Sequence, residues 1–132
     1  MTGKAVFIDC PIFLGELYNA ELRAILPDLV MNIGDPPGGD TVAMLAGVQG
    51  AINDHTMMNE ETLRACRDLK VIVFMGTGAS SYIDVAAASN VGIRVRTIRD
   101  YGNRTVAEHA VALMFAAARR IAAMDSAIRG GV

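Results

Sequence analysis

Residues 69–95, LKVIVFMGTGASSYIDVAAASNVGIRV, contain a strand pattern, a glycine turn, a helix pattern and a second strand pattern. Residues 71–75 form a continuous apolar run, which predicts a central strand that is covered on both faces. Asp84 stands where it can cap a short helix over residues 85–90. Polar and apolar residues alternate over 93–97, which predicts an edge or half-covered strand. The segment is therefore a strand–helix–strand unit, for which a parallel sheet is the expected arrangement.

The same alternation precedes this segment. Further strands are predicted at residues 5–9, 29–33 and 50–54. Helices are predicted at 15–26, ended by Pro27, at 41–48 with Asp40 or Thr41 as the cap, and from Asn59 onward with Leu63, Cys66 and Leu69 facing inward. Five strand–helix repeats with short connections predict an α/β fold with a flavodoxin-like, doubly wound parallel five-stranded sheet.

The last helix pattern differs from the others. Residues 105–108, TVAE, form a capping box, and every residue from 110 to 118 is apolar. A helix that is apolar all round must be buried all round, and no other element remains to cover its outer face. We therefore expect a homodimer through the helix of residues 105–130. The predicted organisation is a sheet domain, residues 1–104, followed by an extra long C-terminal helix, residues 105–132.

The composition is that of a soluble globular protein, with 52% hydrophobic and 20% charged residues and a formal net charge of −2. The twelve Lys and Arg residues are scattered, which argues against nucleic acid as a partner. No apolar run predicts a membrane span or a secretion signal, so we expect a cytoplasmic protein. Cys10 and Cys66 have no CxxC or His companion at ligand spacing, so reduced, buried thiols and no metal site are expected.

In an open parallel sheet, ligands bind beyond the carboxyl ends of the strands. The loop at residues 76–81, GTGASS, is the most informative of these positions. Its two glycines let backbone N–H groups approach a carboxylate or phosphate, although they also suit an ordinary tight turn. The loop lacks the third glycine of GxGxxG, and the chain has no GxxxxGK[ST] motif. The sequence therefore contains no nucleotide-binding motif of its own.

Few residues are candidates for acid–base chemistry. His55 follows the third predicted strand and either contacts a substrate or lies exposed in a turn. His109 fits a packing or interdomain role, and Glu108 fits a helix cap better than a base. Asp9 ends the first strand but has no second carboxylate beside it in sequence.

Three stretches together resemble the D-isomer-specific 2-hydroxyacid dehydrogenase family. They are the run at 69–95, the stretch TVAEHAVALMFAAARR at 105–120, and His55-Thr56 followed by the helix start Met-Asn-Glu-Glu. They occur in the family's order and spacing from about residue 50 to residue 130. The preceding residues match only as a compatible α/β pattern. The span from Gly76 to Asp84 is one residue longer than in the family's usual pattern.

The resemblance implies an NAD-dependent enzyme that transfers hydride between NAD(H) and a small 2-keto or 2-hydroxy acid. It implies that the backbone of Gly76, Thr77, Gly78 and Ala79 holds the substrate carboxylate, with His55 nearby, and that Asn103, Thr105 and Val106 lie near the nicotinamide. The family's NAD loop and its substrate-binding Arg, Glu and catalytic His follow downstream. We therefore expect a truncated chain that has no catalytic residue, binds little or no NAD and is inactive alone.

The alternative is a non-enzymatic flavodoxin-like binding or assembly module. A response-receiver domain needs clustered acids at the end of the first strand, where Asp9 stands alone. A flavodoxin needs a hydroxyl-rich phosphate loop there, and residues 10–15, CPIFLG, do not supply one. An assembly domain that pairs through the apolar last helix is compatible with the enzyme interpretation.

Overall fold

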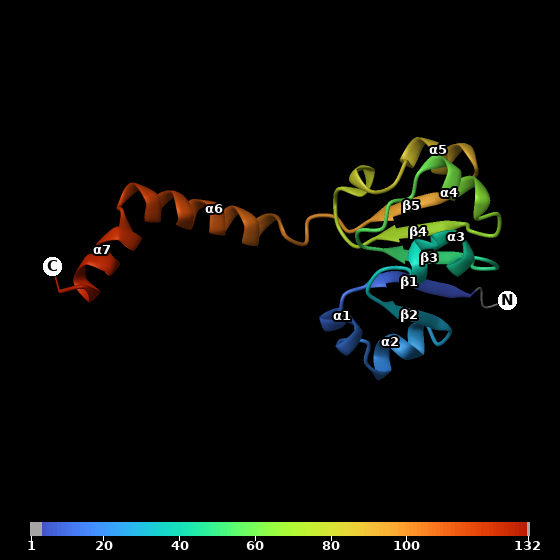
Figure 1. The fold of residues 1–132 in the computed structure, drawn as a ribbon, viewed down its shortest axis with the longest axis horizontal. Helices are drawn as coiled ribbons and strands as arrows, with labels where there is room; N and C mark the ends of the chain where they lie inside the picture. Colours follow the sequence, from blue (N-terminus) through green and yellow to red (C-terminus); the bar gives the residue numbers. More distant parts are fainter. Residues whose placement is uncertain (1–3, 132) are drawn as a thin grey trace. The chain divides into compact units, whose positions relative to one another are not determined.

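The computed structural model describes residues 4–131, which form two compact units that divide between Arg99 and Asp100. The first unit is built on a five-stranded sheet in which all strands are parallel and are ordered β2-β1-β3-β4-β5 (Figure 1). The strands are β1 (Ala5–Cys10), β2 (Leu29–Ile33), β3 (Gly50–Asn53), β4 (Val71–Phe74) and β5 (Arg94–Thr97). The predicted flavodoxin-like sheet is confirmed, and β5 is an edge strand as expected.

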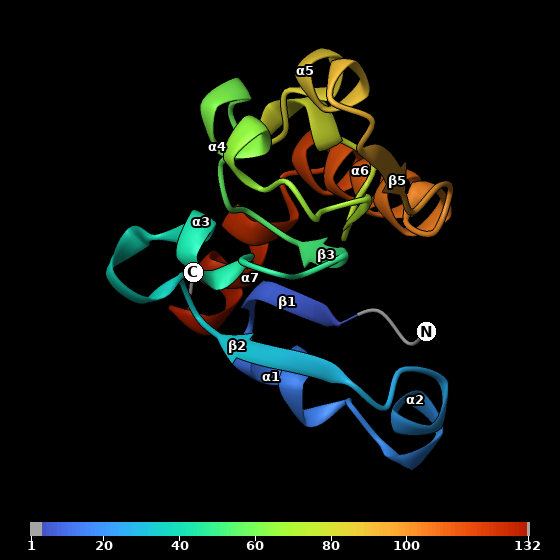
Figure 2. The same cartoon turned by 90° about the vertical axis from the view of Figure 1, so that its right-hand side faces the viewer.

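Short helices connect the strands. They are α1 (Ile12–Glu16), α2 (Ala20–Ile25), α3 (Thr41–Met44), α4 (Glu60–Ala65) and α5 (Val85–Asn90). Helices α1 and α2 lie beside β2, while α3, α4 and α5 follow one another along the sheet (Figure 2). The expected caps Asp40 and Asp84 are confirmed, and Asn59 is a further cap: each side chain accepts a backbone N–H from the first turn of its helix, at 2.8–2.9 Å.

The core of the first unit lies on one face of the sheet. Its buried side chains come from β1, β3, β4 and the segments that include α3, α4 and α5, among them Ile8, Leu45, Ala51, Leu63, Cys66, Leu69, Ile72 and Ala88. Strand β4 alternates, because Ile72 and Phe74 are buried whereas Val71 and Val73 are only half-buried. The prediction that β4 is covered on both faces is therefore wrong. Within the first unit, α1 and α2 lie over β1 and β2 rather than over β4.

The helix expected at residues 15–26 is two helices, α1 and α2. Asn19 separates them with an extended backbone (ψ −176°), and its side chain accepts the N–H of Leu22 at 3.1 Å. Asn competes with helical hydrogen bonds through its own side chain, so it begins a new helix rather than continuing the old one.

Helix α3 is also shorter than expected, because it ends at Met44 instead of Val48. Gly47 has φ +71°, a left-handed conformation that glycine adopts without a steric cost. Leu45 and Val48, which lie on either side of this turn, are both buried in the core.

The second unit consists of α6 (Asn103–Ala118) and α7 (Ile121–Arg129) instead of one long helix. The break is at Arg120, whose left-handed backbone (φ 52°, ψ 37°) cannot propagate an α-helix. The capping box is also wrong, because α6 begins at Asn103, without a side-chain cap. Glu108 instead accepts a hydrogen bond from Arg104 Nε at 2.6 Å.

The large apolar side chains along α6, including Leu113, Met114 and Phe115, are exposed in this structure. None of the helices in residues 4–131 combines the length and the apolar character that crossing a membrane requires. The outer limits of the two predicted domains, residues 1 and 132, lie outside the described residues.

Candidate functional site

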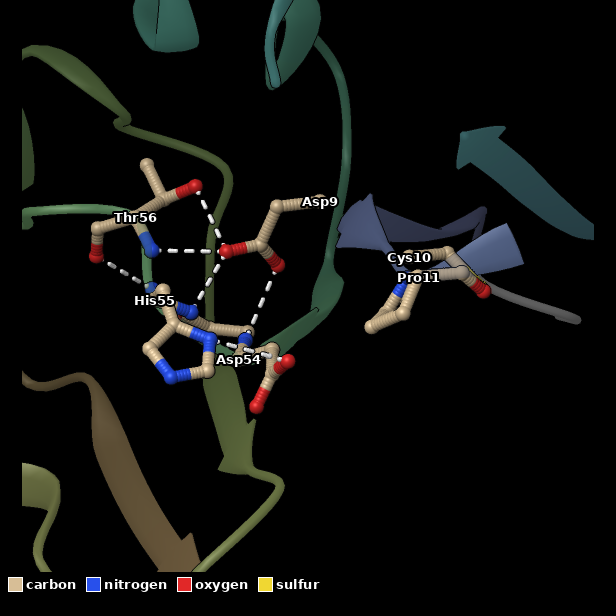
Figure 3. A network of polar contacts seen from close by, with 7 residues as sticks. Asp9, Cys10, Pro11, Asp54, His55 and Thr56 are labelled. Atoms are coloured by element: carbon tan, nitrogen blue, oxygen red, sulfur yellow. Dashed lines mark hydrogen bonds and ion pairs between the residues drawn. The ribbon is translucent and has the colours of Figure 1, made fainter. Parts of the chain in front are cut away.

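The ends of β1 and β3 are joined through the carboxylate of Asp9 (Figure 3). Oδ2 of Asp9 accepts the backbone N–H groups of His55 and Thr56, both at 2.6 Å, and the Thr56 hydroxyl at 2.8 Å. Oδ1 accepts the N–H of Asp54 at 2.9 Å. In the order β2-β1-β3-β4-β5 the chain reverses direction across the sheet between β1 and β3, which is where ligands bind in such folds. At this point of the sheet the carboxylate of Asp9 accepts the backbone N–H groups of residues 54–56.

The imidazole of His55 lies on the outside of this turn. Its Nδ1 is 2.9 Å from Asp54 Oδ2, and its ring meets the Tyr82 ring edge-on, with centroids 5.0 Å apart. Tyr82 in turn stacks on the buried Phe74, at 5.6 Å. The His55 side chain is 68% exposed, so contacts on two sides orient a ring that is otherwise open to a ligand.

The glycine loop after β4 is the second part of the site. In the described part of the chain, the backbone N–H groups of residues 76–79 donate no hydrogen bond to another protein group. Thr77 and Gly78 are exposed, Gly76 is half-buried, and Ala79 is buried where it begins the 3₁₀ turn Ala79–Ser81. Unpaired N–H groups on consecutive residues can bind an anionic oxygen, and those of Thr77 and Gly78 lie on exposed residues.

The turn after β3 and the glycine loop are held side by side by backbone hydrogen bonds. Met75 N–H donates to the Asn53 carbonyl at 2.8 Å, and Met58 N–H donates to the Tyr82 carbonyl at 2.7 Å. Asp84 N–H donates to the Met58 carbonyl at 3.0 Å. The structure thus brings His55 and the segment that follows the glycine loop together, as their places after neighbouring strands predict.

The first unit contains two buried thiols. Cys10 ends β1 beside Asp9, and Cys66 directly follows α4. Burial raises the pKa of the Cys10 thiol, and the carboxylates of Asp9 and Asp54 raise it further. Burial alone raises the pKa of the Cys66 thiol. Both cysteines are free and buried, as expected, and a thiol held protonated is a poor nucleophile.

The predicted cofactor-side residues belong to the second unit. Asn103 donates its side-chain amide to Asp100 Oδ1 at 2.8 Å, and Thr105 and Val106 are exposed in the first turns of α6. His109 is exposed as well. Over residues 4–131, no group of three or more His, Cys, Asp or Glu side chains is placed to hold a metal ion.

Sequence reasoning missed the role of Asp9. Its partners are 45 to 47 residues away, so no local pattern connects them. The available signal was positional: an acid at the end of β1 and a run of N–H donors at the end of β3 meet wherever those two strands are neighbours.

A family model described as D-isomer specific 2-hydroxyacid dehydrogenase, catalytic domain, matches residues 13–128. The chain belongs to this family. The resemblance seen in the sequence is thereby confirmed, and its relatives are dehydrogenases.

Two curated relatives show the extent of the similarity. The glycerate dehydrogenase of Methylorubrum extorquens is 39% identical over 92 residues, which are 70% of this chain and 29% of that protein. The D-3-phosphoglycerate dehydrogenase of Mycobacterium leprae is 33% identical over 131 residues, which are 95% of this chain and 24% of that protein. The chain thus spans less than a third of the length of these 2-hydroxyacid dehydrogenases.

Solved structures share the fold of this chain. An acyclic imino acid reductase in complex with NADPH and D-Arg is 26% identical, with a TM-score of 0.83 over 98% of this chain and 41% of that chain. The D-lactate dehydrogenase from Aquifex aeolicus, complexed with NAD and lactic acid, is 21% identical, with a TM-score of 0.75 over 96% of this chain and 37% of that chain. The second likeness shows the fold alone. The chain is a domain of the 2-hydroxyacid dehydrogenase type.

Proposed function

We propose that the chain is the substrate-side half of an NAD-dependent D-2-hydroxyacid dehydrogenase, which transfers hydride between NAD(H) and a small 2-keto or 2-hydroxy acid. The observation that carries the proposal is the row of unpaired N–H groups at residues 76–79, in the loop that leads to Tyr82, whose ring meets the His55 ring. Family membership supplies the reaction class.

In this proposal Gly76, Thr77, Gly78 and Ala79 hold the carboxylate of the acid. Backbone N–H groups fixed by the fold bind an anion without first having to reorganise, so they orient the neighbouring carbonyl carbon. His55 contacts the same ligand through Nε2, because Nδ1 lies against Asp54.

The cofactor supplies or accepts the hydride when it is bound in the parent enzyme. Asn103, Thr105 and Val106 are proposed to lie against the nicotinamide. A dinucleotide cradle does not fit on the remaining residues, because the glycine loop leads into a single 3₁₀ turn rather than the N-terminus of a long helix. We therefore propose that the 132-residue chain binds little or no NAD, contains no catalytic residue and is inactive alone.

The helix expected to pair two copies is now α6. Its large apolar side chains Leu113, Met114 and Phe115 are exposed, and exposed apolar surface favours association. We propose a homodimer through residues 105–130. Light scattering coupled to size exclusion measures the mass directly, and a monodisperse monomer contradicts the proposal.

The non-enzymatic alternative is not favoured, because the family match covers residues 13–128. The cytoplasmic location stays a prediction.

Calorimetry on this chain tests the proposal. Pyruvate should bind, pyruvamide should not because it lacks the carboxylate, and NADH should bind weakly or not at all. Gly78→Pro removes one loop N–H and should weaken pyruvate binding, whereas Gly78→Ala keeps that N–H and should not. Equal binding of pyruvate and pyruvamide, or an unchanged affinity in Gly78→Pro, contradicts the carboxylate role of the loop.

A further inference from the structure

The carboxylate of Asp9 is engaged entirely within the chain. It accepts four hydrogen bonds at 2.6–2.9 Å, and all of them come from residues 54–56. The side chain is only 8% exposed. Consecutive backbone N–H groups that point at one anion form a nest, and here β1 supplies the anion. Asp9 is therefore placed to shape the turn rather than to meet a ligand.

The turn carries His55, and its backbone leaves that residue little freedom. The N–H groups of Asp54, His55 and Thr56 are all held by Asp9, and the Thr56 carbonyl accepts the Asn53 side-chain amide at 2.9 Å. These contacts fix the main chain on both sides of the imidazole.

Two side chains then select the orientation of the ring. Asp54 Oδ2 lies 2.9 Å from Nδ1, and a carboxylate at this distance favours the Nδ1–H tautomer of the neutral ring, with Nε2 as the free nitrogen. The edge contact with Tyr82, at an interplanar angle of 85°, sets the ring plane. Asp54 itself is part of the turn that Asp9 holds, so both the position and the tautomer of His55 depend on Asp9.

We propose that Asp9 is the positioning residue for His55: its carboxylate fixes the turn at residues 54–56, which presents His55 Nε2 to the acid ligand. The ligand part of this inference rests on the proposed function. The placement of the ring does not, because it is measurable without any ligand.

Two substitutions of Asp9 separate the hydrogen-bond acceptors of its carboxylate from the space that the side chain fills. In Asp9→Asn the amide oxygen can keep the three donors now on Oδ2, but the NH₂ group then faces the N–H of Asp54, donor against donor. In Asp9→Ala all four acceptors are lost, which leaves a cavity that a formate ion can fill.

Nitrogen-15 NMR of the imidazole rings is the first test, on the full 132-residue chain. The unmodified chain should show His55 as the Nδ1–H tautomer. Asp9→Ala should shift His55 toward the Nε2–H form that free histidine prefers, and added formate should restore the Nδ1–H form. His109, the other histidine of the chain, lies on α6 and is the internal control. An unchanged tautomer in both Asp9 variants overturns the inference, and Asp9→Asn serves if Asp9→Ala fails to fold.

Pyruvate affinity in a double-mutant cycle is the second test. Asp9→Asn should weaken binding roughly tenfold in the presence of His55 and have no effect in the His55→Ala background. Equal weakening in both backgrounds means that Asp9 does not act through His55. If His55→Ala leaves the affinity unchanged, the ligand role of His55 is wrong, and the inference with it. Failure of the unmodified chain to bind pyruvate contradicts the proposed function itself.

Discussion

Gly76 and Gly78 stand two residues apart in the same loop, but the structure gives them different surroundings. A Cβ atom on Gly76 lies 3.0 Å from Phe74 Cε1, which is tighter than ordinary van der Waals contact. A Cβ atom on Gly78 meets nothing nearer than Ser81 Oγ, at 3.8 Å. Neither glycine has a positive φ, so alanine is compatible with both backbones. The pair Gly76→Ala and Gly78→Ala therefore isolates one steric contact.

The expected magnitudes follow from two opposing effects. Replacing a glycine by alanine at a compatible position stabilises a protein by about 0.4–1 kcal/mol, because the unfolded chain loses freedom. Adding a methyl group to a packed site costs about 1–3 kcal/mol. Phe74 is 5% exposed and stacks on Tyr82, so its ring has little room to move. Gly76→Ala should lower the free energy of unfolding by roughly 0.5–2 kcal/mol, whereas Gly78→Ala should raise it slightly.

Urea denaturation followed by far-ultraviolet circular dichroism measures both values. The slope of the unfolding free energy against urea should be the same in the two variants, so that midpoints can be compared. Equal stability of Gly76→Ala and Gly78→Ala would refute the packing argument, since it would mean that the Phe74 ring does not restrict residue 76.

Further predictions concern the core, a helix cap and the thiols. Ile72→Ala should lower the free energy of unfolding by about 2–5 kcal/mol, and Val73→Ala, on the half-covered face of β4, should lower it clearly less. Urea denaturation measures both losses, and equal losses would mean that β4 is covered on both faces. Asp84→Ala removes the cap of α5 and should cost about 1 kcal/mol, while Asp84→Asn keeps an acceptor and should cost less in thermal unfolding. The native chain should react slowly with iodoacetamide at Cys10 and Cys66, because their raised pKa keeps the thiolate scarce, and labelling at the rate of a free thiol would contradict this. The folded chain holds the two thiol protons more tightly than the unfolded chain does. The contribution of these thiols to the free energy of unfolding should therefore be fully present below the ordinary thiol pKa and be lost as the pH rises above it.

Local signals account for the elements that the sequence predicted well. Residues 29–33 form a strand with the expected limits, and Asp84 caps the helix over 85–90, because each depends on a few adjacent residues. The parallel order of the strands followed from the short connections between them. The glycine loop was found in the same way, as a turn after a strongly apolar strand.

Features that depend on distant partners were missed or wrong. The apolar residues of β4 do not reveal that Val71 and Val73 lack full cover, because cover comes from other segments. The capping-box pattern at 105–108 is present, yet the helix starts one turn earlier. The four donors that meet at Asp9 are assembled only by the pairing of β1 with β3.

Backbone amide NMR during a pyruvate titration measures directly whether the glycine loop binds the acid. The largest shift changes should occur at the N–H signals of residues 76–79 and at His55, and NADH should cause little change anywhere in the chain. Pyruvate-induced changes confined to other residues, or tight NADH binding by this chain, would contradict the proposed function.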